Sequence, residues 1–272
     1  MNKILCSLGA VIGRANGMDI RVLDECIERL ECDGYELLMS RSWYDKVDDI
    51  CTYLTGKSIS LPVFHADKNI GNLISRNEGD DTASAIEIFK INCKIAANLG
   101  CPLMVLHLWG GLDSDKDIAH NIKVYERLEA IAKEYEITLT VENIVCNQRE
   151  PMSHLHALSE AYPEIKFTFD TKMSEFHSQT DWLYKDDFAH IFPHVAHLHI
   201  NDYKGGHMDW SNLKTLHIGD GKVDFTRFFD FVKNSNYTGD FTVEAAAYDA
   251  DGKINFELLN RSFDRIRRYI NG

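Results

Sequence analysis

The amino-acid sequence predicts a single (β/α)8 barrel domain over residues 1–272, and three observations support this prediction. Short runs of β-type residues alternate eight times with amphipathic helical segments, and the ends of these runs lie roughly 25 to 45 residues apart. Strict alternation implies parallel strands joined by right-handed crossovers, and eight such units need about 250 residues. No linker, low-complexity block or change of composition divides the chain, so one domain is expected.

An open, doubly wound sheet is the alternative architecture for the same alternation. Its dinucleotide-binding form would carry the pattern GxGxxG directly after the first strand. The chain instead reads SLGAVIGRANG at residues 7–17, which does not match that pattern. The barrel is therefore the favoured prediction.

The predicted elements follow from residue type and periodicity. In the helical segment 82–100, Gly100 stands where a glycine commonly ends a helix. The N-terminal run briefly imitates a secretory signal peptide, but Ser7 and Gly9 interrupt it and Arg14 follows, so we interpret it as the first strand. The predicted strands are residues 4–8, 35–39, 61–65, 103–108, 137–143, 166–170, 196–200 and 240–245, and the clearest helices are 19–32, 82–100, 121–136 and 255–270.

Composition limits the classes of function. The chain carries 42 Asp and Glu against 29 Lys and Arg, so its net charge is -13. Nucleic-acid affinity comes largely from Lys and Arg displacing counterions, so this balance argues against a nucleic-acid partner. No apolar run is long enough to cross a membrane. The seven cysteines form no CxxC pair and lie mostly in apolar surroundings, so reduced thiols and a cytoplasmic location are expected.

The predicted strand 196–200 alternates apolar residues with histidines. Successive side chains of a strand point to opposite faces, so Ala196, Leu198 and Ile200 are expected to face the helices. His197 and His199 then point to the barrel axis. His199 is nearer the C-terminal mouth, where the active sites of such barrels lie, and His197 is expected one layer deeper as a core or supporting residue.

The same alternation places Glu142, Asp170 and Glu244 at the inward ends of strands five, six and eight. Taken alone, such a carboxylate often only bonds a neighbour, and a lone buried His is usually a satisfied core residue. Together, three carboxylates in one mouth repel each other unless a cation binds them. Glu142, Asp170, His199 and Glu244 therefore predict a divalent metal site.

Two further histidines, His65 and His107, end the third and fourth predicted strands. They are expected either to bind a second metal ion or to contact substrate. Three carboxylates and one imidazole form a mostly oxygen site that suits Mn²⁺, Mg²⁺ or Co²⁺. Zn²⁺ becomes the better candidate if His65 and His107 also bind, with Glu142 as a bridge.

The chain resembles the xylose-isomerase-like TIM-barrel superfamily, which groups sugar isomerases and epimerases with apurinic/apyrimidinic endonucleases. The resemblance covers nearly the whole chain and is carried by LPVFHADKNIG, LGCPLMVLHLWGG, ITLTVENI, FTFDTKM, HLHINDYKG, LHIGDGKVDF and FTVEA. It implies a divalent metal held by residues of strands five to eight. Those residues are here Glu142, Asp170, His199 and Glu244, the same four that strand alternation selects.

The endonuclease branch of this superfamily uses three zinc ions, and its strand-three and strand-four histidines match His65 and His107. Its third zinc requires a His three residues after the strand-six Asp, where this chain has Met173. The Asp-x-His pair expected before GDG is also missing from DWSNLKTLHIGDG. The resemblance therefore argues against phosphodiester cleavage. In several sugar epimerases the missing His contacts substrate, a role that falls here to Lys172 or His177.

The leading hypothesis is an isomerase or epimerase of a sugar, sugar phosphate or polyol. The metal would bind a carbonyl and a neighbouring hydroxyl oxygen, which acidifies the adjacent C–H group and stabilises an enediolate. Glu142 and Glu244 would act as base and acid on opposite faces of that carbon. Trp109 would stack on the sugar, and Asp202 would contact it. The alternatives are an apurinic/apyrimidinic endonuclease or a metal-dependent dehydratase of a polyol or keto acid, and a homo-oligomer is compatible with the sequence.

Overall fold

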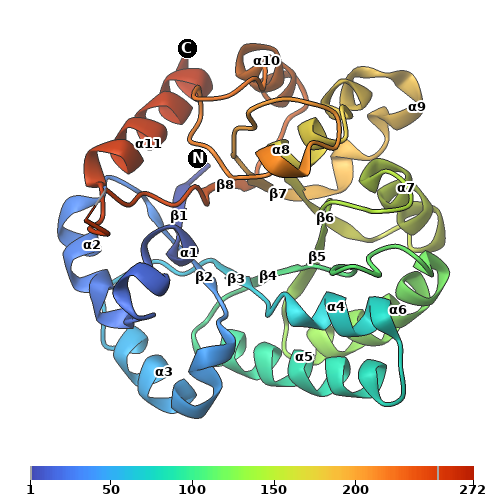
Figure 1. The fold of residues 1–272 in the computed structure, drawn as a ribbon, viewed down its shortest axis with the longest axis horizontal. Coiled ribbons are helices and arrows are strands. Elements are labelled where there is room, and N and C mark those ends of the chain that lie inside the picture. Colours follow the sequence, from blue (N-terminus) through green and yellow to red (C-terminus); the bar gives the residue numbers. More distant parts are fainter. Residues whose placement is uncertain (1, 250) are drawn as a thin grey trace.

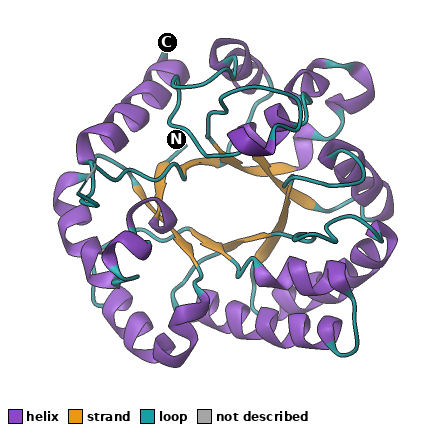
Figure 2. Ribbon diagram, viewed as in Figure 1, coloured by secondary structure: helices purple, strands orange, loops and turns teal. Residues whose placement is uncertain are grey.

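The computed structural model describes residues 2–249 and 251–272, and these residues form a closed barrel of parallel strands. Figure 1 looks along the barrel, and Figure 2 shows the strands as an inner ring enclosed by helices. The closed ring confirms the predicted (β/α)8 barrel and excludes the open sheet. The strands are β1 (Ile4–Ser7), β2 (Gly34–Leu38), β3 (Val63–His65), β4 (Leu103–Leu106), β5 (Thr138–Glu142), β6 (Lys166–Asp170), β7 (Val195–His199) and β8 (Asp240–Val243).

Several helices begin at polar caps that the sequence supplies. Asp117 caps α6 through the backbone N–H of His120, and Asn255 caps α11 through that of Leu258. Gly100, predicted to end a helix, follows α5 with a positive φ of 71°. The helices are α1 (Leu8–Val11), α2 (Leu23–Arg29), α3 (Val47–Thr55), α4 (Asn69–Arg76), α5 (Asp81–Asn98), α6 (Ile118–Glu134), α7 (Pro151–Ala161), α8 (Thr171–Phe176), α9 (Asp186–Ala189), α10 (Phe225–Asn234) and α11 (Phe256–Asn271).

One predicted helix is shorter than expected. The segment 19–32 was predicted as continuous helix, but Asp19 caps a 3-10 turn over Ile20–Val22, and α2 follows it. At the other end Leu30 has extended backbone angles, so the helix stops at Arg29. No helix in the described part of the chain combines the length and apolar character that a membrane crossing needs.

The hydrophobic core has two layers. The main layer lies between the strands and the surrounding helices, where Phe167 and Phe241 from the sheet are fully buried with Phe228 of α10. A small second cluster of Leu5, Val63 and Val105 is separate from this layer. Strand register places these three residues on the same face as Thr140, His65 and Glu36, so they fill the lower barrel interior.

The register of β6 and β7 sets the height of the inward side chains. Phe167 pairs with Val195 and Thr168 with His197, so one extra residue of β7 is accommodated between these pairs. After this irregularity Asp170 pairs with His199. The alternation predicted for the inner face is confirmed, because Thr140 Oγ1 and Thr168 Oγ1 lie 2.7 Å apart inside the barrel.

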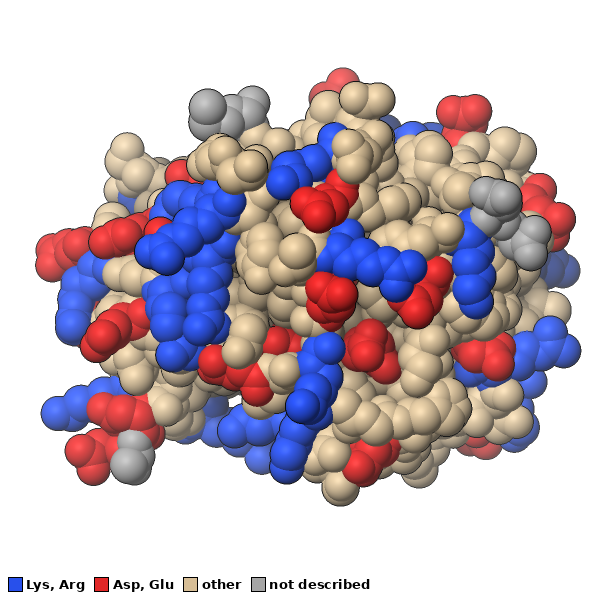
Figure 3. Space-filling view, turned by 90° about the horizontal axis from the view of Figure 1, so that it is seen from above, with Lys and Arg blue, Asp and Glu red and all other residues tan. Residues whose placement is uncertain are grey.

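Charged side chains of both signs share the outer wall. Figure 3 shows a side view of the molecule in which Lys and Arg lie beside Asp and Glu. The arginines of α11 illustrate this mixing, since each lies within ion-pair distance of an aspartate: Arg261 and Arg265 with Asp220, Arg267 with Asp33, and Arg268 with Asp264. Pairing of this kind adds little stability at an exposed surface, but it lowers the positive field that these arginines would otherwise create.

Candidate metal centre

Four side chains from the ends of β5 to β8 converge at the mouth of the barrel. Glu142, Asp170 and His199 are the last residues of their strands, and Glu244 follows β8 directly. One ligand atom from each lies within 4.8 Å of the others. Glu142, Asp170 and His199 are at most 1% exposed, whereas Glu244 remains partly open to the mouth. The structure thus brings together the four residues that the sequence singled out.

Asn201, which the sequence analysis did not select, fixes two of these carboxylates. Its Nδ2 donates to Asp170 Oδ2 at 2.7 Å and to Glu244 Oε2 at 2.8 Å. Its Oδ1 accepts the backbone N–H of Glu244 at 3.2 Å. Asp170 Oδ1 also accepts the backbone N–H of Met173 at the start of α8, 3.0 Å away. The two carboxylates are therefore held in place by side-chain and backbone donors.

A second group joins Glu142 to His65, the last residue of β3, and to His107, which follows β4. His65 Nε2 lies 3.4 Å and His107 Nε2 2.7 Å from Glu142 Oε2, and none of these three atoms has a hydrogen-bond partner among the described residues. His65 Nδ1 lies 3.0 Å from the carbonyl oxygen of Ala66, which only accepts, so the proton of a neutral His65 sits on Nδ1. Its Nε2 lone pair then faces a carboxylate oxygen.

Facing acceptor atoms in a buried space are unfavourable unless a cation lies among them. The donor set around Glu142 Oε2 therefore fits a second divalent ion, for which two imidazoles and a carboxylate are suitable ligands. Burial lowers the pKa of His107 to about 4, although Glu142 raises it, so His107 is neutral at neutral pH. Neutral imidazole is the form that binds metals.

In the group of Glu142, Asp170, His199 and Glu244, the imidazole and the carboxylates shift one another's pKa values. Burial alone would lower the pKa of His199, but Glu244, Glu36 and Glu142 together raise it well above its usual value. Burial opposes ionisation of Glu142 as well, yet His199 and His107 lower its pKa well below the usual range. The carboxylates thus favour a positive charge at their centre. A divalent ion beside His199 Nδ1 would supply that charge.

Asp170 has the least favourable surroundings for ionisation. Burial and the neighbouring charges of Glu142 and Glu244 raise its pKa, Lys172 lowers it, and the net result is a pKa of about 6. A carboxylate that is costly to ionise gains most from a bound cation. Asp170 is therefore the residue whose removal tests the metal site most directly.

Glu36, in the middle of β2, is a further carboxylate that the sequence analysis missed. It is fully buried, and its Oε2 lies 3.1 Å from His197 Nε2 and 3.2 Å from His199 Nε2. The signal was present in the sequence, because Glu36 shares the inward parity of its strand while Tyr35 and Leu37 face the helices.

Two residues expected to contact substrate, Trp109 and Asp202, are buried and bond to the backbone instead. Trp109 is 0% exposed, and its Nε1 donates to the carbonyl of Ile144 at 3.2 Å, so the structure offers no free ring face for a sugar. Asp202 is also buried. Its carboxylate accepts four backbone N–H groups, those of Tyr203, Gly219, Gly221 and Val223, and so anchors the GDG loop.

Lys172 and His177 lie beside the mouth rather than in its centre. Lys172 Nζ donates to Thr215 Oγ1 at 2.8 Å, and this side chain is 6% exposed. His177 Nε2 accepts the backbone N–H of Cys146 at 3.1 Å, and burial lowers the pKa of His177 to about 4. Both side chains therefore have structural partners, and either would have to exchange them to contact a substrate.

A cleft of about 530 Å³ opens beside His107, a volume typical of small-molecule sites. Its lining is mostly apolar and includes Leu112, which is 96% exposed, and Trp210, which is 51% exposed. The remaining lining residues are Lys68, Asn72, Gly110, Gly111, Ile144, Val145, Asn147 and Met173.

A buried aspartate joins the two loops that form much of this cleft. Asp115 is 4% exposed; its Oδ1 accepts the backbone N–H groups of Asn147 and Gln148 at 2.8 and 2.9 Å. Its Oδ2 accepts from the backbone N–H of Arg149 at 2.8 Å and lies 2.9 Å from His154 Nε2. We call this arrangement the Asp115 clamp. Sequence patterns did not reveal it, because its donors come from a loop whose path depends on the clamp itself.

Fold and site together define a (β/α)8 barrel whose mouth gathers carboxylates and imidazoles suited to divalent ions. A family model described as the xylose isomerase-like TIM barrel matches residues 25–269, and the chain belongs to this family. The resemblance drawn from the sequence motifs is thereby confirmed. No protein with a curated description matches the chain in sequence.

Solved structures with this fold include several sugar epimerases. A D-tagatose 3-epimerase-like protein is 18% identical, with 99% of this chain and 97% of that chain covered and a TM-score of 0.73. A D-allulose 3-epimerase from Methylomonas sp., in complex with D-allulose, is 15% identical, with coverages of 98% and 97% and a TM-score of 0.72. The IOLI protein with a bound zinc atom is 14% identical, with coverages of 99% and 98% and a TM-score of 0.77. At these identities the likeness establishes the fold alone.

Proposed function

We propose that this protein is a divalent-metal-dependent isomerase or epimerase of a sugar or polyol. The observation that carries the proposal is the convergence of Glu142, Asp170, His199 and Glu244 at the barrel mouth. A cleft of a size that suits a sugar is lined by His107, whose Nε2 lies 2.7 Å from Glu142 Oε2, a member of this group. Similar structures described as D-allulose 3-epimerase with D-allulose and L-ribulose 3-epimerase support a sugar substrate.

The donor set suggests which residues would hold the ions. Glu142, Asp170, His199 and Glu244 would hold one ion, for which Mn²⁺, Mg²⁺ or Co²⁺ is suited. His65, His107 and Glu142 would hold a second, for which Zn²⁺ is suited. When bound, a divalent ion draws electron density from a substrate carbonyl and its neighbouring hydroxyl oxygen, which makes the C–H group between them more acidic.

Glu142 and Glu244 would move the proton. One carboxylate removes the proton from the carbon next to the carbonyl, and the electron pair of the broken C–H bond enters an enediolate. Delivery of a proton by the other carboxyl group to the opposite face of the same carbon completes an epimerisation. Delivery to the neighbouring carbon, with the proton of the original hydroxyl passing to the former carbonyl oxygen, exchanges carbonyl and hydroxyl and completes an isomerisation. Both residues come from strand ends of a rigid barrel, which favours a fixed geometry.

The cleft favours a neutral substrate over a phosphorylated one. A phosphate dianion requires several cationic or N–H donors. Among the described residues that line the cleft, Lys68 is the one Lys or Arg, and apolar side chains such as Ile144, Met173 and Trp210 form much of the wall. We therefore place an unphosphorylated sugar or polyol first.

Solvent exchange tests this proposal. The purified protein with Mn²⁺ or Co²⁺ should incorporate deuterium from D₂O into at least one ketose of a panel that includes tagatose, allulose and ribulose, and NMR would detect the lost C–H signal. Glu244→Gln should abolish the exchange and retain the fold. Glu257→Gln, at an exposed position in the first turn of α11, is the matched control and should exchange like the wild type.

The same purified protein, incubated with an abasic-site duplex, tests the nuclease alternative. Met173 at the position of the third-zinc His and the net charge of -13 argue that an abasic-site duplex stays uncut. Strand scission at the abasic site that depends on Glu142 would overturn the proposed function. Loss of water from a polyol without C–H exchange would instead establish the dehydratase alternative.

A further inference from the structure

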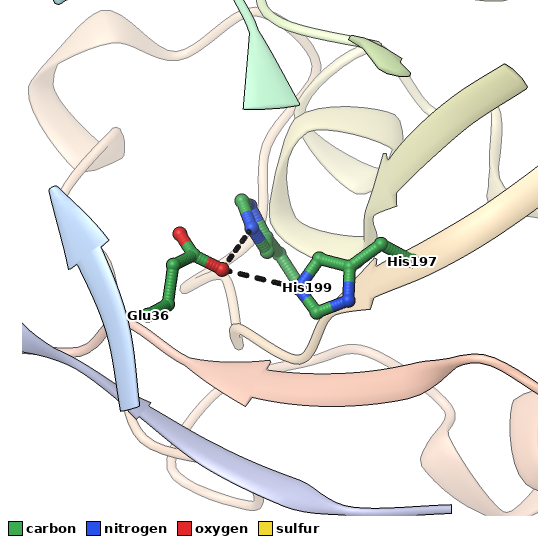
Figure 4. A group of neighbouring side chains, drawn as sticks. All are labelled: Glu36, His197 and His199. Carbon is green, nitrogen blue, oxygen red and sulfur yellow. Dashed lines mark hydrogen bonds and ion pairs between the residues drawn. The ribbon is translucent and has the colours of Figure 1, made fainter. Parts of the chain in front are cut away.

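Glu36 lies inside the barrel and is not one of the residues proposed to hold an ion. Figure 4 shows it extending from β2 toward the imidazoles of His197 and His199, both carried by β7. All three side chains are at most 1% exposed. A carboxylate so deeply buried is stable only with donors of its own, and the two imidazoles supply them.

The contacts of Glu36 determine which nitrogen of each ring carries the proton. A carboxylate only accepts hydrogen bonds, so the imidazoles of His197 and His199 must donate their Nε2–H groups to Glu36 Oε2, at 3.1 and 3.2 Å. Nδ1 of His199 is then the atom that faces the metal-binding carboxylates. It lies 2.9 Å from Glu142 Oε1 and 3.3 Å from Glu244 Oε2.

We infer that Glu36 is a positioning residue for the metal centre, which holds the His199 ring in the orientation and tautomer that present the Nδ1 lone pair to the ion. Metal-binding histidines depend on such a partner, because it fixes the ring and raises the basicity of the ligating nitrogen. The negative charge of Glu36 also adds to the attraction for a cation. This inference rests on the metal site of the proposed function, and not on its reaction.

His199 depends on Glu36 more strongly than His197 does. Thr242 Oγ1 lies 2.9 Å from His197 Nε2 and offers this ring a second partner. Among the described residues, His199 Nε2 has Glu36 Oε2 as its one acceptor. Loss of Glu36 would therefore leave a buried N–H of His199 unpaired, and the ring could lower its energy by rotating or by moving the proton to Nδ1.

Metal affinity of three variants tests this inference. Glu36→Leu removes the acceptor, Glu36→Gln keeps a neutral acceptor of similar shape, and Thr242→Val removes a partner of His197 alone. We expect Glu36→Leu to weaken binding of Mn²⁺, an ion suited to the site of His199, by about 10- to 100-fold, measured by chelator competition. Glu36→Gln should lose less, and Thr242→Val should bind within about twofold of the wild type.

A second readout reports the tautomer itself. In the wild type saturated with Mg²⁺, a diamagnetic ion suited to the same site, ¹⁵N NMR of the histidine side chains should show a protonated Nε2 and a metal-bound Nδ1 for His199. This pattern should persist in Thr242→Val. In Glu36→Gln, which also covers the case that Glu36→Leu does not fold, the Nε2–H signal of His199 should shift because its acceptor is no longer charged.

The outcomes separate this inference from the proposed function. Wild-type Mn²⁺ affinity in both Glu36 variants, or a metal-bound Nε2 of His199, would overturn the role of Glu36. A wild type that binds no divalent ion would overturn both the metal site and this role. Metal binding that depends on Glu36 without any sugar exchange would support the inference and count against the proposed function alone.

Discussion

The Asp115 clamp offers a prediction whose size can be worked from its hydrogen bonds. The change is Asp115→Asn, which keeps the shape of the side chain but replaces one carboxylate oxygen by an NH₂ group. The carboxylate serves four donors, two at each oxygen, three of them backbone N–H groups of residues 147–149. An asparagine can serve two of the four, and its NH₂ group then faces the other two donors.

The expected loss of stability is several kcal/mol. Hydrogen bonds to an ionised group contribute about 1.5 to 3 kcal/mol each, so two lost bonds amount to about 3 to 6 kcal/mol. Relaxation of the loop reduces this, and we expect about 3 to 4 kcal/mol. For a chain of this size 1 kcal/mol shifts Tm by about 2 to 4 °C, so Tm should fall by about 10 °C.

Thermal unfolding followed by circular dichroism measures the effect, with Asp113→Asn as the matched control. Asp113 lies in the same loop, its side chain is 38% exposed, and it pairs with Lys116 at 3.8 Å. The control makes the same change of charge, and an exposed pair contributes about 1 kcal/mol or less. Equal Tm values for the two variants would refute the structural reasoning.

The clamp also predicts how the stability difference between wild type and Asp115→Asn depends on pH. Burial raises the pKa of Asp115, but His154 and the backbone N–H groups outweigh burial and lower it to about 2. A pKa depressed below the unfolded value of about 3.9 means that the stabilisation is complete above that value and disappears as the pH falls toward 2. The Tm gap between wild type and Asp115→Asn should therefore be constant from about pH 5 to 7 and should narrow below about pH 4. A gap that narrows on raising the pH would contradict this account.

Two other changes test the site and its support. Asp170→Ala should lose most of the bound metal in elemental analysis. It should also lose most of the stabilisation by Mn²⁺, which in the wild type is about 2.7 kcal/mol at 100 times Kd and appears as a rise in Tm. Equal metal content in both proteins would refute the ligand assignment. Gly71→Ala should lower Tm and weaken metal binding at His107, because the new Cβ would clash with the backbone carbonyl oxygens of His107 and Trp109. An unchanged Tm would show that the segment after β4 can move to make room.

The barrel and the inward residues of its strands could be predicted from sequence because both depend on simple periodicities. Strand–helix alternation specifies a parallel sheet, and the period of two along a strand assigns each side chain to one face. His199 and Asp170 lie opposite each other in the sheet although the prediction used each strand separately. The prediction did not require the loop conformations, because the C-terminal ends of parallel strands all lie at one end of a barrel.

The sequence analysis missed or misplaced several residues, for different physical reasons. Glu36 obeys the same alternation as His199, but it lies in the middle of its strand, paired with Val63, while the prediction considered strand ends. Asn201 and Asp115 act from loops, whose paths depend on hydrogen bonds formed only in the folded chain. Trp109 lies next to glycines and was expected at the surface of the mouth, yet its ring packs inward beneath a loop carbonyl.

These supports bear on how the site would bind an ion. Asn201 ties the carboxylates of β6 and β8 together, the carbonyl of Ala66 fixes the proton of His65, and Glu36 fixes that of His199. Four of the proposed ligands, Asp170, Glu244, His65 and His199, thus have a partner that holds them in place before an ion arrives. A preorganised site loses little side-chain freedom on binding, so more of the interaction free energy appears as affinity. The same rigidity keeps Glu142 and Glu244 at fixed strand ends, which a proton transfer between two faces of one carbon requires.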